Sequence, residues 1–300
     1  MYERYEISNP LNNTTMKRFT QIMALVLAAL VLVPAAAQAQ KKNKEKVGIV
    51  AHRGFWNCDE AGYAKNSIAA LRCAQEAGCW GSEFDVNMTS DGVLLVYHDG
   101  NVEGKSIEKN PHSAFKYYRL KNGEPIPTID EYLTQAKKYP KTVLVYELKP
   151  HSTPEVESKF VDLTIQKLRE HKLLNPKKVI FISFSYHMCK EIAKKLPNFT
   201  VQYLGGNKAP KDVMADGING IDYHHGSFRK NPSWSKDARD LKMSRNVWTV
   251  NDKKVMDEMY KMGVDFITTD TPLDARQVLK DKNMKEKIKN YKHYKDPYII

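Results

Sequence analysis

The chain has 300 residues and a formal net charge of +12 at pH 7, carried mainly by lysines spread along its length. This charge favours anionic partners such as phosphorylated compounds or anionic lipid surfaces. Nucleic acid is disfavoured as a partner, because the aromatic residues do not cluster with the basic ones as a stacking groove requires. The four cysteines form no CxxC motif or His/Cys cluster, which argues against a zinc site. They permit a disulfide, but their spacing identifies no pairing.

The first segment has the pattern of a secretory signal peptide. The pair Lys17-Arg18 precedes an apolar run, Ile22 to Val33, which is shorter than the ~20 residues that a membrane-spanning helix needs. A small-x-small site follows at Ala37-Gln38-Ala39. We therefore expect a signal peptide over residues 1–39, with an over-extended reading frame before Met16, and an exported protein, periplasmic or secreted. A single N-terminal membrane anchor is the alternative.

The rest of the chain is predicted to be one domain, residues 40–280, followed by a basic tail, residues 281–300. No Pro/Gly/Ser-rich linker or internal repeat interrupts the domain, and its length suffices for one large core. The lysine-rich tail is interpreted either as a solvated surface or as a contact with an anionic membrane, which the function does not require.

Short β-branched runs alternate with longer amphipathic stretches along this domain. Strands are predicted at Gly48–His52, Gly81–Val86, Leu94–His98, Thr142–Leu148, Val179–Phe184, Val201–Leu204, Gly220–Tyr223, Val247–Val250 and Phe266–Thr268. Helices are predicted at Ser67–Ala77, Ile129–Tyr139, Pro154–His171, Tyr186–Leu196, Ser235–Met243, Lys253–Met262 and Leu273–Leu279. Because nearly every strand is followed by a helix, the pattern indicates a parallel α/β sheet. About eight such units in about 230 residues favour a (β/α)8 TIM barrel over a doubly wound sheet.

One pair of strands departs from this alternation. Gly81–Val86 and Leu94–His98 are joined by the turn TSDG, which is too short for a helix. The irregular stretch that follows, Asp99 to Pro127, is interpreted as a small insertion after the second strand region, lying over one end of the barrel.

Polar residues recur at the carboxyl ends of the predicted strands, where the reactive groups of such barrels gather. They are His52, Arg53, Glu83, Asp85, His98, Glu147 and Lys149. Side chains along a strand alternate between faces, so Glu83 and Asp85 share a face, as do Glu147 and Lys149. Three carboxylates can therefore converge on one pocket.

Converging carboxylates repel one another unless a cation neutralises them. An all-oxygen set of donors suits Mg²⁺ or Ca²⁺ better than zinc, and the sequence does not separate these two ions. The alternative is that each carboxylate pairs with a nearby base, Glu147 with Lys149 or Glu83 with Arg53, and that no metal binds.

The motifs that carry these residues are AHRG, EFDVNMTSDGVLLVYHD, IPTIDEYL, ELK, WTVN and DFITTDTP. Together and in this order they resemble the glycerophosphodiester phosphodiesterase family, metal-dependent TIM-barrel hydrolases, from Val47 to about Lys280. The resemblance implies that Glu83, Asp85 and Glu147 are metal ligands. It implies that His52 and His98 are the general acid and base, in an order that stays open, and that Arg53 and Lys149 bind the phosphate.

Four further residues are given roles near the metal ligands and the two histidines. The resemblance favours Trp248 as an apolar wall for the glycerol carbons, while Asn251 and Asn66 join the substrate-binding group, Asn66 more by positioning a neighbour. Asp270 is given a structural role. The family usually carries Pro-Glu-Asn-Thr before its first helix, whereas this chain has Ala64-Lys65-Asn66-Ser67. Lys65 thus replaces an acidic residue near the expected metal, or points into solvent.

The leading hypothesis is an enzyme that hydrolyses glycerophosphodiesters to sn-glycerol 3-phosphate and an alcohol, with a divalent cation and two histidines as acid and base. A phospholipase acting on intact phospholipids is one alternative, although no apolar amphipathic segment outside the signal peptide supports it. An inactive barrel that binds phosphate esters is the other.

Overall fold

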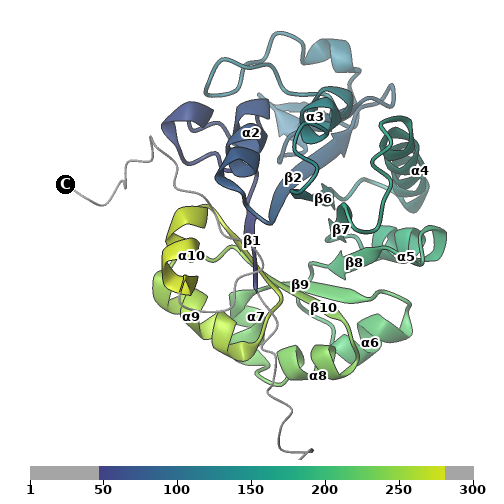
Figure 1. Cartoon of the computed structure of the whole chain (residues 1–300). Helices are drawn as coiled ribbons and strands as arrows, with labels where there is room; N and C mark the ends of the chain where they lie inside the picture. Colours follow the sequence, from purple (N-terminus) through teal and green to yellow (C-terminus); the bar gives the residue numbers. More distant parts are fainter. Residues whose placement is uncertain (1–46, 281–300) are drawn as a thin grey trace, which may run out of the picture. The chain divides into compact units, whose positions relative to one another are not determined.

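Eight parallel strands form a closed barrel in the computed structural model, which describes residues 47–280 (Figure 1). In order around the barrel they are β1 (Gly48–Ala51), β2 (Gly81–Met88), β6 (Val143–Leu148), β7 (Val179–Ser183), β8 (Thr200–Tyr203), β9 (Gly220–His224), β10 (Ser244–Trp248) and β11 (Phe266–Thr269). Strand β1 pairs in parallel with both β2 and β11, which closes the sheet. The predicted TIM barrel is confirmed.

Helices lie outside the strands and cover the barrel (Figure 1). They are α2 (Ile68–Ala77), α3 (Ile129–Ala136), α4 (Pro154–Glu170), α5 (Tyr186–Lys195), α6 (Pro210–Ala215), α7 (His225–Lys230), α8 (Trp234–Asp240), α9 (Lys253–Met262) and α10 (Pro272–Leu279), with short 3-10 turns η1 (Asp59–Ala61) and η2 (His112–Ala114). Several begin at a side-chain cap that satisfies a backbone N–H of the first turn. The Ser67 hydroxyl accepts from Ala70 N, and Thr128 forms a capping box with Glu131.

The alternation of side chains along each strand separates two apolar regions. Phe84 of β2 and Tyr146 of β6 point outward, where their rings pack 4.8 Å apart in the large core between strands and helices. Val50 and Val145 point inward and belong to a smaller cluster that also contains Phe266. Polar side chains share this inner face, because strand pairing places Glu83 opposite Val145 and Glu147 opposite Ile182.

The insertion after β2 is present and carries its own small core. Strand β3 (Leu94–Val96) pairs antiparallel with the end of β2, and β4 (Asn101–Val102) forms a hairpin with β5 (Lys105–Ser106). Buried apolar residues hold the segment together: Leu95, Val102, Ile107, Phe115, Leu120 and Ile126. The predicted strand through His98 ends at Val96, so His98 lies in the loop beyond it.

The predicted strand that is most displaced is β10, which was expected at Val247–Val250 and lies at Ser244–Trp248. Its first residues were not predicted as strand because they include the polar residues Arg245 and Asn246. Both are buried, because Arg245 Nε donates to Asp265 (3.0 Å) and Asn246 Nδ2 donates to Asp222 (3.1 Å). Helices α6 and α7 were also missed, since each is a six-residue helix, too short to show apolar periodicity.

The structure tests the expectation for the cysteines but not those for the two chain ends. The predicted signal peptide, residues 1–39, and the basic tail, residues 281–300, lie outside them. From residue 47 to residue 280, no helix is long and apolar enough to span a bilayer. All four cysteines are buried, and they form no disulfide within the described residues.

Candidate active site

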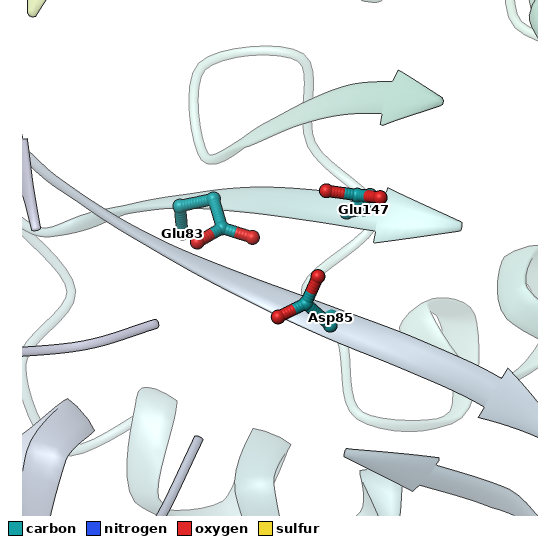
Figure 2. A group of neighbouring side chains, drawn as sticks. All are labelled: Glu83, Asp85 and Glu147. Atoms are coloured by element: carbon teal, nitrogen blue, oxygen red, sulfur yellow. The ribbon is translucent and has the colours of Figure 1, made fainter. Parts of the chain in front are cut away.

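Three carboxylates meet inside the barrel at adjacent strands β2 and β6 (Figure 2). Parallel pairing sets Asp85 directly opposite Glu147, and Glu83 lies two residues earlier on the same face of β2. One oxygen from each carboxylate lies within 4.8 Å of the others. Glu83, Asp85 and Glu147 are only 3%, 1% and 7% exposed, so water screens their mutual repulsion poorly.

Hydrogen bonds from the chain hold each carboxylate but leave the group incompletely satisfied. Glu83 Oε2 accepts from the backbone N–H of Arg53 (2.7 Å), and Glu147 Oε1 accepts from Lys149 Nζ (2.7 Å). Lys149 also reaches Asp85 Oδ1 at 3.2 Å, and the Arg53 guanidinium lies 3.5 Å from Asp85. Glu83 Oε1 is buried with no hydrogen-bond partner among residues 47–280. Such an atom is costly unless a cation contacts it.

The ionisation of the three acids reflects this shortage of positive charge. Burial, followed by the charges of Asp85 and Glu147, raises the pKa of Glu83 well above its usual value. Burial and Asp85 raise the pKa of Glu147 to about 7. Burial alone would raise the pKa of Asp85, but Lys149, His98 and Arg53 together hold it below its ordinary value. The alternative of simple ion pairs is therefore correct for Lys149, which pairs with Glu147. It does not account for Glu83, whose charge no ion pair neutralises within the described residues.

This donor set fits a hard divalent cation. Three buried carboxylates supply only oxygen ligands, and one oxygen is unpartnered. The family that the chain resembles is divalent-metal dependent, and the predicted ligands Glu83, Asp85 and Glu147 are the group that could hold such an ion.

His52 follows β1 and is oriented by a carboxylate from the opposite end of the chain. Its Nδ1 lies 2.8 Å from Asp270 Oδ1, and Asp270 also accepts from Trp56 Nε1 (2.9 Å). Burial would raise the pKa of Asp270, but the hydrogen bonds from His52, Asn251 and Trp56 lower it to about 2. An ionised Asp270 keeps the proton of neutral His52 on Nδ1 and leaves Nε2 to act on a ligand. Asp270 is thus a positioning residue, beyond the structural role expected for it.

His98 reaches the same cavity from the insertion. Its Nδ1 lies 2.6 Å from Asp99 Oδ1, which again leaves Nε2 as the other ring nitrogen. Burial, with contributions from the cations Lys149 and Arg53, lowers the pKa of His98 despite the opposing effect of Asp85. The two histidines line one cavity of about 80 Å³ together with the three carboxylates.

The HRG turn explains why a polar sequence follows a buried strand. Arg53 adopts the left-handed conformation (φ 56°), which directs its N–H to Glu83 and its carbonyl to the N–H of Asn66 (3.0 Å). Gly54 also has positive φ, and a Cβ there would lie 2.7 Å from the backbone of Ala70. The glycine is therefore required for this turn to pack against α2.

Most of the predicted site residues line the cavity of about 80 Å³, which we call the catalytic cavity. They are His52, Arg53, Glu83, Asp85, His98, Glu147, Lys149 and Trp248. Asn66 and Asn251 lie outside this cavity, and their assignment to substrate binding stays a prediction. Asn66 Nδ2 donates to Asp85 Oδ2 (2.8 Å), and its Oδ1 accepts from Asp85 N. Asn251 Nδ2 donates to Asp270 Oδ2 (2.7 Å). Each asparagine therefore orients a carboxylate: Asn66 orients Asp85, and Asn251 orients Asp270.

Comparisons with known proteins agree with this geometry. Residues 52–274 match the Glycerophosphoryl diester phosphodiesterase family. The chain belongs to this family. It is 30% identical to a glycerophosphodiester phosphodiesterase of Caldanaerobacter subterraneus subsp. tengcongensis over 76% of this chain and 95% of the relative. The crystal structure of a glycerophosphodiester phosphodiesterase from Parabacteroides distasonis is 42% identical, with a TM-score of 0.77, over 80% of this chain and 99% of that one.

A phosphodiesterase from Oleispira antarctica has the same fold at 22% identity, with a TM-score of 0.66, over 78% of this chain and 96% of that one. The glycerophosphodiester phosphodiesterase described here is thus an enzyme of the phosphoric diester hydrolases, as predicted.

One wall of the phosphodiesterase cavity is apolar. Trp248 is fixed by a hydrogen bond from its Nε1 to the carbonyl of Asp222 (2.9 Å), and its ring packs edge-to-face with Phe184 at 5.6 Å. Phe184 also lines the cavity and was not predicted as a site residue, although it directly follows β7 and so lies at a strand end. Asp222 of β9 was not predicted either. Its burial, followed by the charge of Glu147, raises its pKa well above the usual value.

Lys65, the departure from the family's motif, does not contact the carboxylates. Its Nζ lies 4.5 Å from the centre of the Trp56 ring, and the side chain is exposed. Lys65 lines a neighbouring cavity instead.

Proposed function

We propose that the enzyme hydrolyses glycerophosphodiesters to sn-glycerol 3-phosphate and an alcohol, using a divalent cation, Mg²⁺ or Ca²⁺, and acid–base catalysis by His52 and His98. The observation that carries this proposal is the presence of two histidines and three buried carboxylates around one cavity. The family assignment supports the substrate class. The Oleispira antarctica relative is described in complex with the product sn-glycerol-3-phosphate.

The reaction makes two demands on the site. A phosphodiester is an anion, so its charge must be offset before a nucleophile can approach. Glu83, Asp85 and Glu147 would hold the cation, which supplies Lewis-acid stabilisation of the phosphoryl oxygens when bound. Arg53 has a planar guanidinium that matches two phosphate oxygens, and Lys149 adds a further positive charge beside them.

The second demand is proton transfer. A hydroxyl that attacks phosphorus must lose a proton, and the departing alkoxide must gain one. The Nε2 atoms of His52 and His98 are available for these transfers, because each ring uses Nδ1 on a carboxylate. Asp270 and Asp99 stabilise the imidazolium that forms on whichever ring accepts the proton. The apolar faces of Trp248 and Phe184 offer a surface for the glycerol carbons.

The test is turnover of glycerophosphodiesters by the purified protein with Mg²⁺, Ca²⁺ or chelator, followed as release of sn-glycerol 3-phosphate. We expect turnover that chelator abolishes and added cation restores. The Glu83→Gln variant should lose activity, whereas Asp216→Asn, a surface carboxylate paired with Lys190, should retain it. Turnover that chelator leaves unchanged would refute the metal requirement. Tight binding without turnover would show an inactive barrel, and activity on intact phospholipids alone would show a phospholipase.

We also propose that the protein is exported. The proposal rests on the signal-peptide pattern of the first 39 residues. Fractionation of the native host, with detection of the protein and its N-terminal sequence, tests it. A soluble mature form that begins near residue 40 outside the cytoplasm is expected, and a full-length cytoplasmic form would overturn the proposal.

A further inference from the structure

A second cavity adjoins the catalytic one and shares Arg53 and His98 with it. It has a volume of about 400 Å³ and is enclosed by the segment after β1 and by the insertion after β2. We call it the head-group cavity. Its aromatic and cationic lining consists of Trp56, Tyr63, Tyr97, Tyr118, Lys65 and Lys121.

The position of this cavity makes it the exit for one arm of the substrate. The catalytic cavity, about 80 Å³, is much smaller than the roughly 300 Å³ or more of ordinary ligand pockets. A phosphodiester gripped by Arg53 carries two ester arms. Phe184 and Trp248, which follow β7 and end β10, form an apolar wall for one of them. The other arm can extend past Arg53 and His98, where the head-group cavity opens.

Positive charge already covers two of the four aromatic rings of this cavity. Lys65 Nζ lies 4.5 Å from the centre of the Trp56 ring, and Lys121 Nζ lies 5.2 Å from that of Tyr63. Aromatic faces of this kind are what bind quaternary ammonium groups in other proteins. Here the faces of Trp56 and Tyr63 are occupied by ammonium groups of the chain itself, so a choline at either ring would have to displace a lysine against electrostatic repulsion.

Negative charge in the cavity is scarce. Within the described part of the chain, neither Lys65 nor Lys121 forms an ion pair with a carboxylate. Asp99 is the one acidic residue among those that line the cavity, and it is engaged with His98 Nδ1 at 2.6 Å. The two ammonium groups are therefore available to an incoming anion.

We propose that the head-group cavity receives the departing alcohol, and that Lys65 and Lys121 select head groups bearing their own phosphate or carboxylate over head groups bearing choline. This inference rests on the proposed hydrolysis of glycerophosphodiesters. It gives Lys65, which replaces the acidic residue usual in the family, a role in substrate choice.

The experiment compares kcat/KM for three substrates: glycerophosphoinositol 4-phosphate, glycerophosphoglycerol, whose head group is uncharged, and glycerophosphocholine. It uses the full-length protein loaded with Mg²⁺ or Ca²⁺. We expect the phosphorylated substrate to exceed glycerophosphocholine by about tenfold, which corresponds to about 1.4 kcal/mol shared between the ion pairs of the two lysines. The preference should shrink in 0.5 M NaCl, because salt screens exposed charges.

The decisive variant is Lys65→Met combined with Lys121→Met, which keeps the apolar stems over the rings but removes both charges. It should lower the ratio of the anionic to the choline substrate about tenfold. The matched control is Lys116→Met, because Lys116 also lies over a tyrosine, Tyr117, at 4.8 Å in the same insertion, but outside the head-group cavity. The control should leave the ratio at the wild-type value.

The outcomes separate this inference from the proposed function. Turnover of the panel with a ratio near or below one, or with a ratio that the double variant leaves unchanged, overturns the head-group selection alone. Absence of turnover on every member of the panel in the presence of either cation overturns both proposals. A ratio lowered equally by the Lys116→Met control would show a general effect of surface charge and would also overturn the selection.

Discussion

Replacing Glu147 with glutamine should stabilise the metal-free enzyme at neutral pH while weakening its binding of divalent cations. Burial and the nearby Asp85 raise the pKa of Glu147 from 4.5 to about 7. A carboxyl with a higher pKa in the folded state binds its proton more tightly there than in the unfolded state. It therefore costs no stability below about pH 4.5 and destabilises the fold progressively as the pH rises to about 7.

The magnitude follows from the two pKa values. One pKa unit corresponds to about 1.4 kcal/mol, so the cost of ionising Glu147 in the metal-free fold reaches about 3 kcal/mol above pH 7. Glutamine removes this cost, because it carries no charge at any pH, and its carbonyl oxygen can still accept from Lys149 Nζ. In a barrel of this size 3 kcal/mol corresponds to a rise in Tm of about 6 to 12 °C.

Thermal unfolding followed by circular dichroism at pH 5, 6, 7 and 8 tests this prediction. In chelator, the Tm of the wild type should fall more steeply from pH 5 to pH 8 than that of Glu147→Gln. With excess Mg²⁺ or Ca²⁺ the order should reverse at pH 8, because the cation stabilises the wild type through binding to the folded state. Asp216→Asn is the control. Parallel pH profiles for wild type and Glu147→Gln in chelator, or no stabilisation of the wild type by either cation, would refute the reasoning.

Four further substitutions probe the groups around the carboxylates. His52→Ala and His98→Ala should each lower kcat by a factor of about 100 or more with an unchanged Tm, and near-normal turnover in either variant would remove that histidine from catalysis. Asp270→Asn should lower kcat about 10- to 100-fold and shift the pH–rate profile, because His52 loses the acceptor that sets its tautomer; an unaltered profile would argue against positioning. Asn66→Ala should weaken cation affinity about 10- to 100-fold, measured by calorimetry, since Asp85 loses both amide contacts; unchanged affinity would contradict that role.

The main features of the site could be predicted because they depend on local rules. A period of two along a strand puts Glu83 and Asp85 on one face, and parallel pairing brings β6 beside β2 with Glu147 in register. The strand-end rule for barrels then identifies His52, Arg53 and Lys149. The family motifs added the roles of these residues, and the alternation of strands and helices added the barrel.

Other features depend on contacts between distant parts of the chain, which no local pattern contains. Asp270 lies 218 residues from His52, and only the closure of the barrel, with β11 beside β1, brings the two side chains to 2.8 Å. The start of β10 could not be predicted, because an arginine is rarely buried in a strand. Arg245 is buried there because it pairs with Asp265, a residue of another segment.

The fold class and the strands that carry the reactive groups can be predicted from the sequence, because hydrophobic period and strand-end chemistry are properties of short segments. The tertiary structure was needed to show that Asn66 and Asn251 donate to carboxylates and that Phe184 packs against Trp248. It alone showed that Lys65 enters a cavity beside the catalytic one. Those placements depend on how the insertion and the loops pack over the barrel, and the energy of that packing comes from residues far apart in the sequence.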